Sequence, residues 1–281
     1  MVDNNSIRTN LNSNSAENEI RLLLSEPKNK NKTIVLLEGE DDIQLFTKLL
    51  NRERIFFFES YSGKCGVKEI LRKFTGEYRV IGIIDRDYLM EIVPKLFYCD
   101  YCNAEMMIVS NEGSFVDTLF QLKTGISNSI ELRTKVLYKL FYFSIIRKLN
   151  EEKNWGICFE KVPIVNIVNN FDDLQKIIEI VNYKNSLNKI DNNKILIIKN
   201  EVERLRGQNL LNYTNGHDFF KGMAEELRKL FPNNKIKNIS YDHLACLFRT
   251  GYTIDCFKMT CLYNELLKFQ FDYKLEIVFY K

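Results

Sequence analysis

The first third of the chain alternates short apolar runs with segments of helical period. Residues 33–37, 55–58 and 80–84 are continuous apolar runs, typical of strands that are buried on both faces of a sheet. Between these runs, residues 41–50 and 67–74 place apolar side chains three and four positions apart, as in helices that pack one face against a core. The order strand, helix, strand, helix, strand predicts a βαβαβ unit with a parallel sheet.

Helical periodicity dominates the remainder of the chain. A weaker run at residues 95–98 predicts a fourth strand, and residues 103–109 predict a helix after it. Further helices are predicted over residues 17–26, 131–149, 172–181, 193–205, 219–231 and 263–269. The pattern therefore predicts an α/β protein in three parts: an N-terminal arm over 1–32, a Rossmann-like α/β domain over 33–125 and an α-rich, basic domain over 126–281.

The net charge of +3 is the sum of two unlike parts. Residues 1–125 hold 16 basic and 19 acidic side chains, whereas residues 126–281 hold 24 basic and 18 acidic ones. Such asymmetry indicates either a surface that attracts nucleic acid or ordinary solvated helix faces, and composition leaves both open. The basic side chains that would follow a phosphate backbone are Arg147, Lys148, Lys153, Lys184, Lys189, Lys194, Lys199, Arg204 and Arg206.

Composition predicts a soluble, cytoplasmic protein with no membrane partner. Charged residues make up 27% and hydrophobic residues 45% of the chain, and no apolar run reaches the length of a membrane-spanning helix. The polar N-terminal segment lacks the apolar core of a signal peptide, so the seven cysteines are expected to be reduced. Cys99 and Cys102 form one CxxC pair without a second at zinc spacing, which favours buried thiols over a zinc site.

Carboxylates follow two of the predicted strands. Glu38 comes directly after the first strand, and Asp85 and Asp87 come directly after the third. The carboxyl ends of parallel strands line the ligand crevice of such sheets, and carboxylate oxygens suit Mg²⁺ or Mn²⁺. Asp42, four residues past Glu38, is a candidate ligand or orienting group. The alternative is that these acids stabilise helix N-termini or lie in loops.

The two acidic segments together resemble the motifs of the Toprim domain, which type IA and type II topoisomerases, bacterial primases and overcoming-lysogenization-defect nucleases share. Residues 36–42, Leu-Leu-Glu-Gly-Glu-Asp-Asp, resemble its first motif, and residues 83–87, Ile-Ile-Asp-Arg-Asp, resemble its D-x-D motif. Gly63 stands where Toprim domains commonly keep a glycine. The resemblance covers residues 33–110, about a quarter of the chain, and implies the Toprim form of the α/β fold.

Two more segments resemble a narrower group, the Toprim-like nucleases that act as anti-phage effectors beside an ATPase, as in PARIS-type systems. Residues 100–107 resemble an acid-bearing segment downstream of D-x-D, and residues 215–218, Asn-Gly-His-Asp, resemble a motif of the second half. Between residues 126 and 211 no segment carries the resemblance.

The resemblance implies a metal-dependent endonuclease that cleaves nucleic acid, with RNA, tRNA included, favoured over DNA. It implies Glu38 as general base or metal ligand, Asp85 and Asp87 as ligands of Mg²⁺ or Mn²⁺, and Lys64 as a phosphate contact. Glu105 would complete a second metal position or is a surface acid.

The same resemblance implies an ATPase partner protein and a homodimer. The chain has no phosphate-binding loop of the G-x-x-x-x-G-K-[ST] type, so ATP use would belong to the partner. His217 and Asp218 are either structural or part of the substrate site. The alternative function is a non-catalytic Toprim-like module that docks onto an ATPase or nucleic acid.

Overall fold

The computed structural model describes residues 13–122, 126, 128–232 and 235–279. They divide into two compact units. The sheet unit lies within residues 1–85, 91–100 and 253–281, and the helical unit lies within residues 86–90 and 101–252. The first twelve residues of the predicted N-terminal arm, and residue 125 at the predicted domain boundary, lie outside the described residues.

The sheet unit confirms the predicted α/β class. Among the described residues, four parallel strands pair in the order β2-β1-β3-β4. They are β1 (Thr33–Leu37), β2 (Ile55–Glu59), β3 (Val80–Ile84) and β4 (Leu96–Tyr98). Every residue of β1 and β3 is buried, which explains their unbroken apolar sequences, whereas β2 is half-buried over most of its length.

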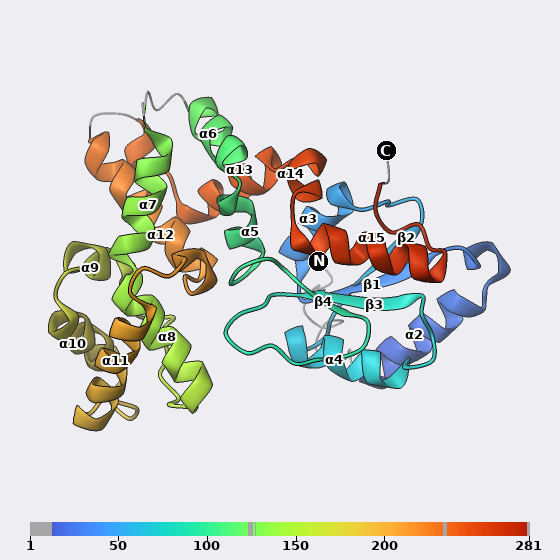
Figure 1. Ribbon diagram of the computed structural model, residues 1–281, viewed down its shortest axis with the longest axis horizontal. Coiled ribbons are helices and arrows are strands. Elements are labelled where there is room, and N and C mark those ends of the chain that lie inside the picture. The colour runs from blue at the N-terminus through green and yellow to red at the C-terminus, as the bar shows by residue number, and fades with distance from the viewer. Residues whose placement is uncertain (1–12, 123–125, 127, 233–234, 280–281) are drawn as a thin grey trace, which may run out of the picture. The chain divides into compact units, whose positions relative to one another are not determined.

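Helices cover both faces of this sheet (Figure 1). One face packs against α2 (Ser13–Ser25) and α4 (Gly63–Lys73), where Ile34 and Leu36 meet Val67 and Ile70 in one buried cluster. The other face carries α3 (Glu40–Leu49), α14 (Ile254–Lys258) and α15 (Cys261–Tyr273). The alternation of side chains along β1 divides its residues between the two cores.

Apart from the short η1 (Pro27–Asn29) of the sheet unit, the helical unit contains every other helix that the structure describes, and it has no strand in its described part. These elements are α5 (Ala104–Ser110), α6 (Glu112–Gln121), α7 (Ser129–Lys139), α8 (Phe141–Lys153), α9 (Ile164–Asn169), α10 (Leu174–Lys184), α11 (Asn192–Leu205), η2 (Leu210–Asn212), α12 (Gly216–Leu230), η3 (Lys235–Asn238) and α13 (Tyr241–Gly251). The single helix predicted over 131–149 is two helices that meet at Leu140, so periodicity alone missed the break.

The compact units do not coincide with the domain boundary predicted at 125/126. Helices α5 and α6 belong to the helical unit, where Phe115 lies 5.0 Å from Phe248 between ring centroids. The C-terminal segment returns to the sheet unit, where Phe269 packs edge-on against Phe97 of β4 at 5.3 Å. Periodicity identifies helices but not the core that each one joins, which explains the difference.

Within the described ranges, every helix is too short or too polar to cross a membrane.

Candidate functional site

The strand order creates a topological switch point between β1 and β3. From β1 the chain passes through α3 to β2 on one side, and then crosses through α4 to β3 on the other side. In open parallel sheets, ligands bind beyond the carboxyl ends of the strands at such a point. Glu38 follows β1 directly and Asp85 follows β3 directly, so the two predicted site residues flank the switch point.

Glu38 and Asp85 are in direct contact. The backbone N–H of Asp85 donates a hydrogen bond of 2.7 Å to Oε1 of Glu38. Both side chains are half-buried, and 47 positions of sequence separate them. The pairing of β1 with β3, in which Leu36 lies opposite Gly82, accounts for the approach because it aligns the ends of the two strands.

Burial and the negative charge of Asp85 raise the pKa of Glu38 to about 7, from an ordinary value of 4.5. The Asp85 N–H and the positive charges of Lys64 and Lys68 oppose that rise without cancelling it. A carboxyl with a pKa near neutrality exchanges its proton at the working pH of most enzymes, which is the property of a general base.

The turn between β2 and α4 lies beside Glu38. Gly63 adopts a left-handed conformation with φ of +51°, and a Cβ built there would lie 3.9 Å from Oε2 of Glu38. The buried hydroxyl of Ser60 donates to the Gly63 carbonyl oxygen at 2.7 Å, which fixes the turn. The backbone conformation therefore favours glycine here, whereas a Cβ would make only an ordinary van der Waals contact with the carboxylate.

Two lysines of α4 act on Glu38 through their charge. Lys64 is the predicted phosphate contact, and Lys68, one helical turn later, was not singled out from the sequence. The i, i+4 spacing of the two lysines is the signal that could have identified the second one. Lys68 also forms an ion pair of 3.0 Å with Glu91.

Asp42 lies in the first turn of α3 beside Glu40 and Asp41, where acids match the helix dipole. Its side chain is half-buried. Across the ranges that the structure describes, no three His, Cys, Asp or Glu side chains are grouped closely enough to form a ready metal cage. The structure thus brings Glu38 and Asp85 together as a pair.

The other two predicted ligands, Asp87 and Glu105, belong to the helical unit. Asp87 has a left-handed φ of +43°, and its N–H donates to the carbonyl oxygen of Cys102 at 2.6 Å. The hydroxyl of Tyr88 donates to the carbonyl oxygen of Tyr213 at 3.1 Å, which also ties residues 86–90 to this unit. Glu105, near the start of α5, is half-buried.

The segments 100–107 and 215–218 have structural roles that the sequence did not identify. Asp100, in the sheet unit, accepts the N–H groups of Cys261 at 2.8 Å and Leu262 at 2.9 Å and so caps α15. In the helical unit, a Cβ at Gly216 would lie 2.4 Å from Cβ of Glu105, so only glycine permits this approach. Asn215 caps α12 by accepting the N–H of His217.

Of the two roles considered for His217 and Asp218, Asp218 has the structural one, because its side chain is buried. His217 is exposed. Asp218 is 2% exposed and forms an ion pair with Arg147, whose Nη2 donates to Oδ1 at 3.1 Å. Burial raises the pKa of Asp218, and the Arg147 guanidinium opposes that rise. The sequence did not pair Arg147 with Asp218, because 71 positions separate the two residues.

Four of the nine basic residues expected to attract nucleic acid have carboxylate partners inside the helical unit. Besides Arg147, Lys148 pairs with Glu201 at 2.8 Å and with Glu152 at 2.7 Å. Arg204 pairs with Glu201 at 2.5 Å, and Arg206 pairs with Glu203 at 3.0 Å.

Searches against protein-family models, curated proteins and solved structures found no match to this chain. The functional argument therefore depends on the geometry of the two carboxylates and on the motifs around them.

Proposed function

We propose that the protein is a Mg²⁺- or Mn²⁺-dependent nuclease whose catalytic centre is built on Glu38 and Asp85. The observation that carries the proposal is the approach of Asp85 to Glu38, in which the backbone N–H of Asp85 donates to the Glu38 carboxylate, at the switch point of a parallel sheet. Burial and the negative charge of Asp85 raise the proton affinity of the Glu38 carboxyl. Structural carboxylates are normally paired with cations, so an acid beside an acid favours a functional role.

The donor chemistry of the pair fits a hard divalent cation. Carboxylate oxygens are the preferred protein ligands of Mg²⁺ and Mn²⁺, and a bound cation would relieve the repulsion that raises the pKa of Glu38. Asp42, in the same compact unit, is a further candidate ligand. Asp87 and Glu105 are candidate ligands on the motif resemblance alone.

The side chains have separate tasks in this proposal. Glu38, with a pKa of about 7, accepts a proton from the attacking water. Asp85 fixes Glu38 through its backbone N–H. Lys64 offers its ammonium group to a phosphate of the substrate. A divalent cation, when bound, supplies charge stabilisation at the scissile phosphate.

The wider biological role follows from the motif resemblance. We propose a Toprim-type endonuclease of anti-phage defence, acting on RNA in preference to DNA, as a homodimer and under the control of an ATPase partner. The support is the pairing of the E-G and D-x-D motifs on the carboxyl ends of neighbouring strands. The helical unit, with 22 basic and 18 acidic residues, supplies a modest positive charge toward nucleic acid.

Cleavage assays test the proposal. Purified protein, with and without the proposed ATPase partner, is incubated with RNA and with DNA in Mg²⁺, Mn²⁺ or a chelator. We expect cation-dependent cleavage that Glu38→Gln and Asp85→Asn each reduce by roughly 100-fold or more. Glu40→Gln is the matched control, because it removes an exposed acid two residues from Glu38.

Cleavage that is unchanged by Glu38→Gln would refute the assigned catalytic centre. If the wild type binds nucleic acid or the ATPase but cleaves neither substrate under any of these conditions, the non-catalytic binding module is the better description.

A further inference from the structure

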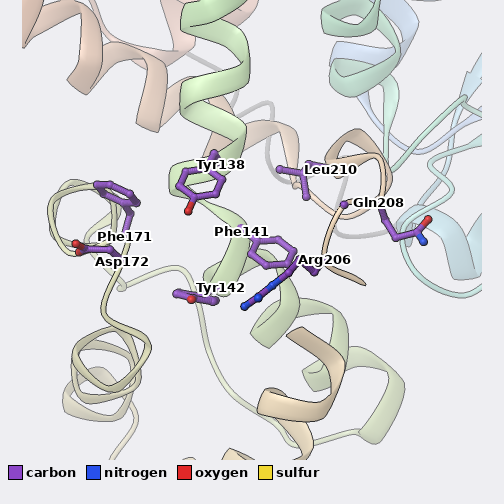
Figure 2. A pocket seen from close by; sticks show the side chains of 9 residues that line it. Tyr138, Phe141, Tyr142, Phe171, Asp172, Arg206, Gln208 and Leu210 are labelled. Carbon is purple, nitrogen blue, oxygen red and sulfur yellow. The ribbon is translucent and has the colours of Figure 1, made fainter. Parts of the chain in front are cut away.

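The helical unit contains a pocket that the proposed nuclease centre does not use. Its volume is about 620 Å³, within the range of small-molecule sites. The pocket is shown in Figure 2, and its lining residues are Tyr138, Phe141, Tyr142, Phe171, Asp172, Arg206, Gly207, Gln208 and Leu210. All of them belong to the helical unit, so the pocket is formed within one compact body.

Four aromatic rings dominate the wall of this pocket. Tyr138 ends α7, Phe141 and Tyr142 begin α8, and Phe171 precedes α10. Tyr138 and Phe171 meet edge to face at 5.9 Å, and Phe141 and Tyr142 lie 5.7 Å apart at a tilt of 35°. Tyr138 is 61% exposed, and the other three rings are half-buried. Ring surface is therefore available to a ligand at the point where α7 gives way to α8.

A guanidinium stands among these rings. Figure 2 shows Arg206 extending beneath Phe141 toward Tyr142, whereas the amide of Gln208 points away. Arg206 is paired with Glu203 at 3.0 Å, and both side chains are about two-thirds exposed. Because exposed ion pairs contribute little free energy, a ligand can replace Glu203 as the partner of Arg206. Next to it, Gly207 has a φ of +81° and open space where a Cβ would be.

We propose that this pocket binds a nucleotide, with the base on the rings of Tyr138, Phe141 and Tyr142 and the phosphate on Arg206. Aromatic rings stack on any nucleobase, and a guanidinium is a forked donor that matches phosphate. The net charge of +4 on the helical unit favours an anionic ligand over a neutral apolar peptide. The inference goes beyond the proposed nuclease function and does not depend on it.

The nucleotide can belong to a single strand or be a free mononucleotide, and binding measurements in a chelating buffer separate the two sources. Fluorescence anisotropy follows a labelled oligouridylate and a labelled oligoadenylate, and calorimetry follows AMP and UMP. The chelator removes divalent cations, so these measurements report binding without cleavage. The pocket can therefore bind nucleotides even if the nuclease proposal fails, and the nuclease proposal can hold even if the pocket binds none. We expect the pocket variants Phe141→Leu and Tyr138→Ser to weaken binding about tenfold each, because they remove stacking surface.

Matched variants control each part of the measurement. Tyr183→Ser removes an 83% exposed aromatic ring outside the pocket and should leave affinity unchanged. Arg206→Gln should weaken binding and reduce its salt dependence, whereas Arg204→Gln should do so much less, since Glu201 holds that arginine. Tyr138 and Arg206 are largely exposed, so their variants test the pocket even if Phe141→Leu fails to fold.

Tight binding of oligonucleotides but not of mononucleotides identifies a strand as the source, and comparable binding of both identifies a free nucleotide. The inference is overturned if neither class binds. It is equally overturned if binding is unaffected by all three pocket variants, or if a neutral aromatic peptide binds where nucleotides do not.

Discussion

Two carboxylates, Glu226 of the helical unit and Glu38 of the sheet unit, have opposite electrostatic surroundings. In the helical unit, Glu226 is 1% exposed and has Lys135 at 2.9 Å, Lys139 at 2.8 Å and Lys229 at 3.3 Å. Burial raises the pKa of Glu226, but the hydrogen bonds of Lys139 and Lys135 outweigh it and hold the pKa at about 2. In the sheet unit, burial and then the negative charge of Asp85 raise the pKa of Glu38 to about 7.

The difference separates acids that support the fold from acids that are available for chemistry. A carboxylate enclosed by cations remains ionised and stabilises the protein at neutral pH. A carboxylate next to a second acid destabilises the protein at neutral pH, and such an arrangement persists where function requires it. The sheet unit therefore carries the catalytic proposal, although the helical unit has more buried ion pairs.

The charge asymmetry of the chain weakens when it is counted by compact unit. The sheet unit has 18 basic and 19 acidic residues, which gives a net charge of −1. The helical unit has 22 basic and 18 acidic residues, which gives a net charge of +4. The sequence halves carry −3 and +6 because the cut at residue 125 does not follow the packing. The positive excess of the helical unit is real but modest.

The largest expected effect comes from breaking a buried pair of the helical unit. Arg147→Met leaves the Asp218 carboxylate without its cation at 2% exposure, and we expect a loss of about 3–5 kcal/mol in the free energy of unfolding. Urea titration measures it. Lys176→Met, which breaks a pair exposed on both sides, should lose less than about 1 kcal/mol. Equal losses would contradict the structural role of the buried pair.

Glu226→Gln should have the next largest effect, a decrease of about 2 kcal/mol in the free energy of unfolding at pH 7. Since the folded pKa is depressed, the stability from Glu226 is present above its ordinary value of 4.5 and disappears as the pH falls toward about 2. The difference in unfolding free energy between wild type and variant should therefore become smaller below pH 4.5 in urea titrations. A difference that stays constant with pH would show that the charge of Glu226 is not its cause. Glu203→Gln, at an exposed site, is the control.

Glu38→Gln should change stability in the opposite direction. The folded pKa is raised, so the ionised side chain destabilises the fold progressively as the pH rises from 4.5 through about 7. Without divalent cations, the free energy of unfolding of the variant should exceed that of the wild type by about 2 kcal/mol at pH 8 and equal it below pH 4.5. Thermal and urea unfolding at both pH values measure the difference. Destabilisation by Glu38→Gln at pH 8 would refute the contrast between the units, and Glu40→Gln should show no such pH dependence.

The smallest effect is expected at the turn beside Glu38. Gly63→Ala forces an L-residue into a φ of +51° and should destabilise the protein by about 1 kcal/mol. Gly76→Ala, at a position with open space and no positive φ, should be neutral or slightly stabilising. If the two substitutions have the same effect, the turn does not require glycine.

The sheet was predictable from the sequence because its signals are local. The apolar runs at 33–37 and 80–84 coincide with β1 and β3, and the weak run at 95–98 became β4. Parallel pairing follows from the helices between the strands, and it brings Glu38 and Asp85 to one edge. The pairing of these two acids was therefore available from chain order and strand geometry alone.

The rest depends on contacts between residues that are distant in sequence. No local pattern pairs Arg147 with Asp218, or returns α15 to the sheet. The aromatic pocket had a weak signal, the run Leu-Tyr-Lys-Leu-Phe-Tyr-Phe at residues 137–143, but its period is that of an ordinary core helix. With the break at Leu140, Tyr138, Phe141 and Tyr142 line the pocket while Phe143 is buried, and tertiary packing decides such a break.

The central claim, that Glu38 and Asp85 form a cation site, is tested most directly by calorimetric titration with Mn²⁺ at pH 7 in two buffers of different ionisation enthalpy. With a pKa of about 7, Glu38 is partly protonated at that pH, so cation binding to the wild type should release roughly half a proton. Glu38→Gln should bind more weakly and release none. The claim is contradicted if Mn²⁺ binds both proteins equally, or if the wild type binds it without releasing protons.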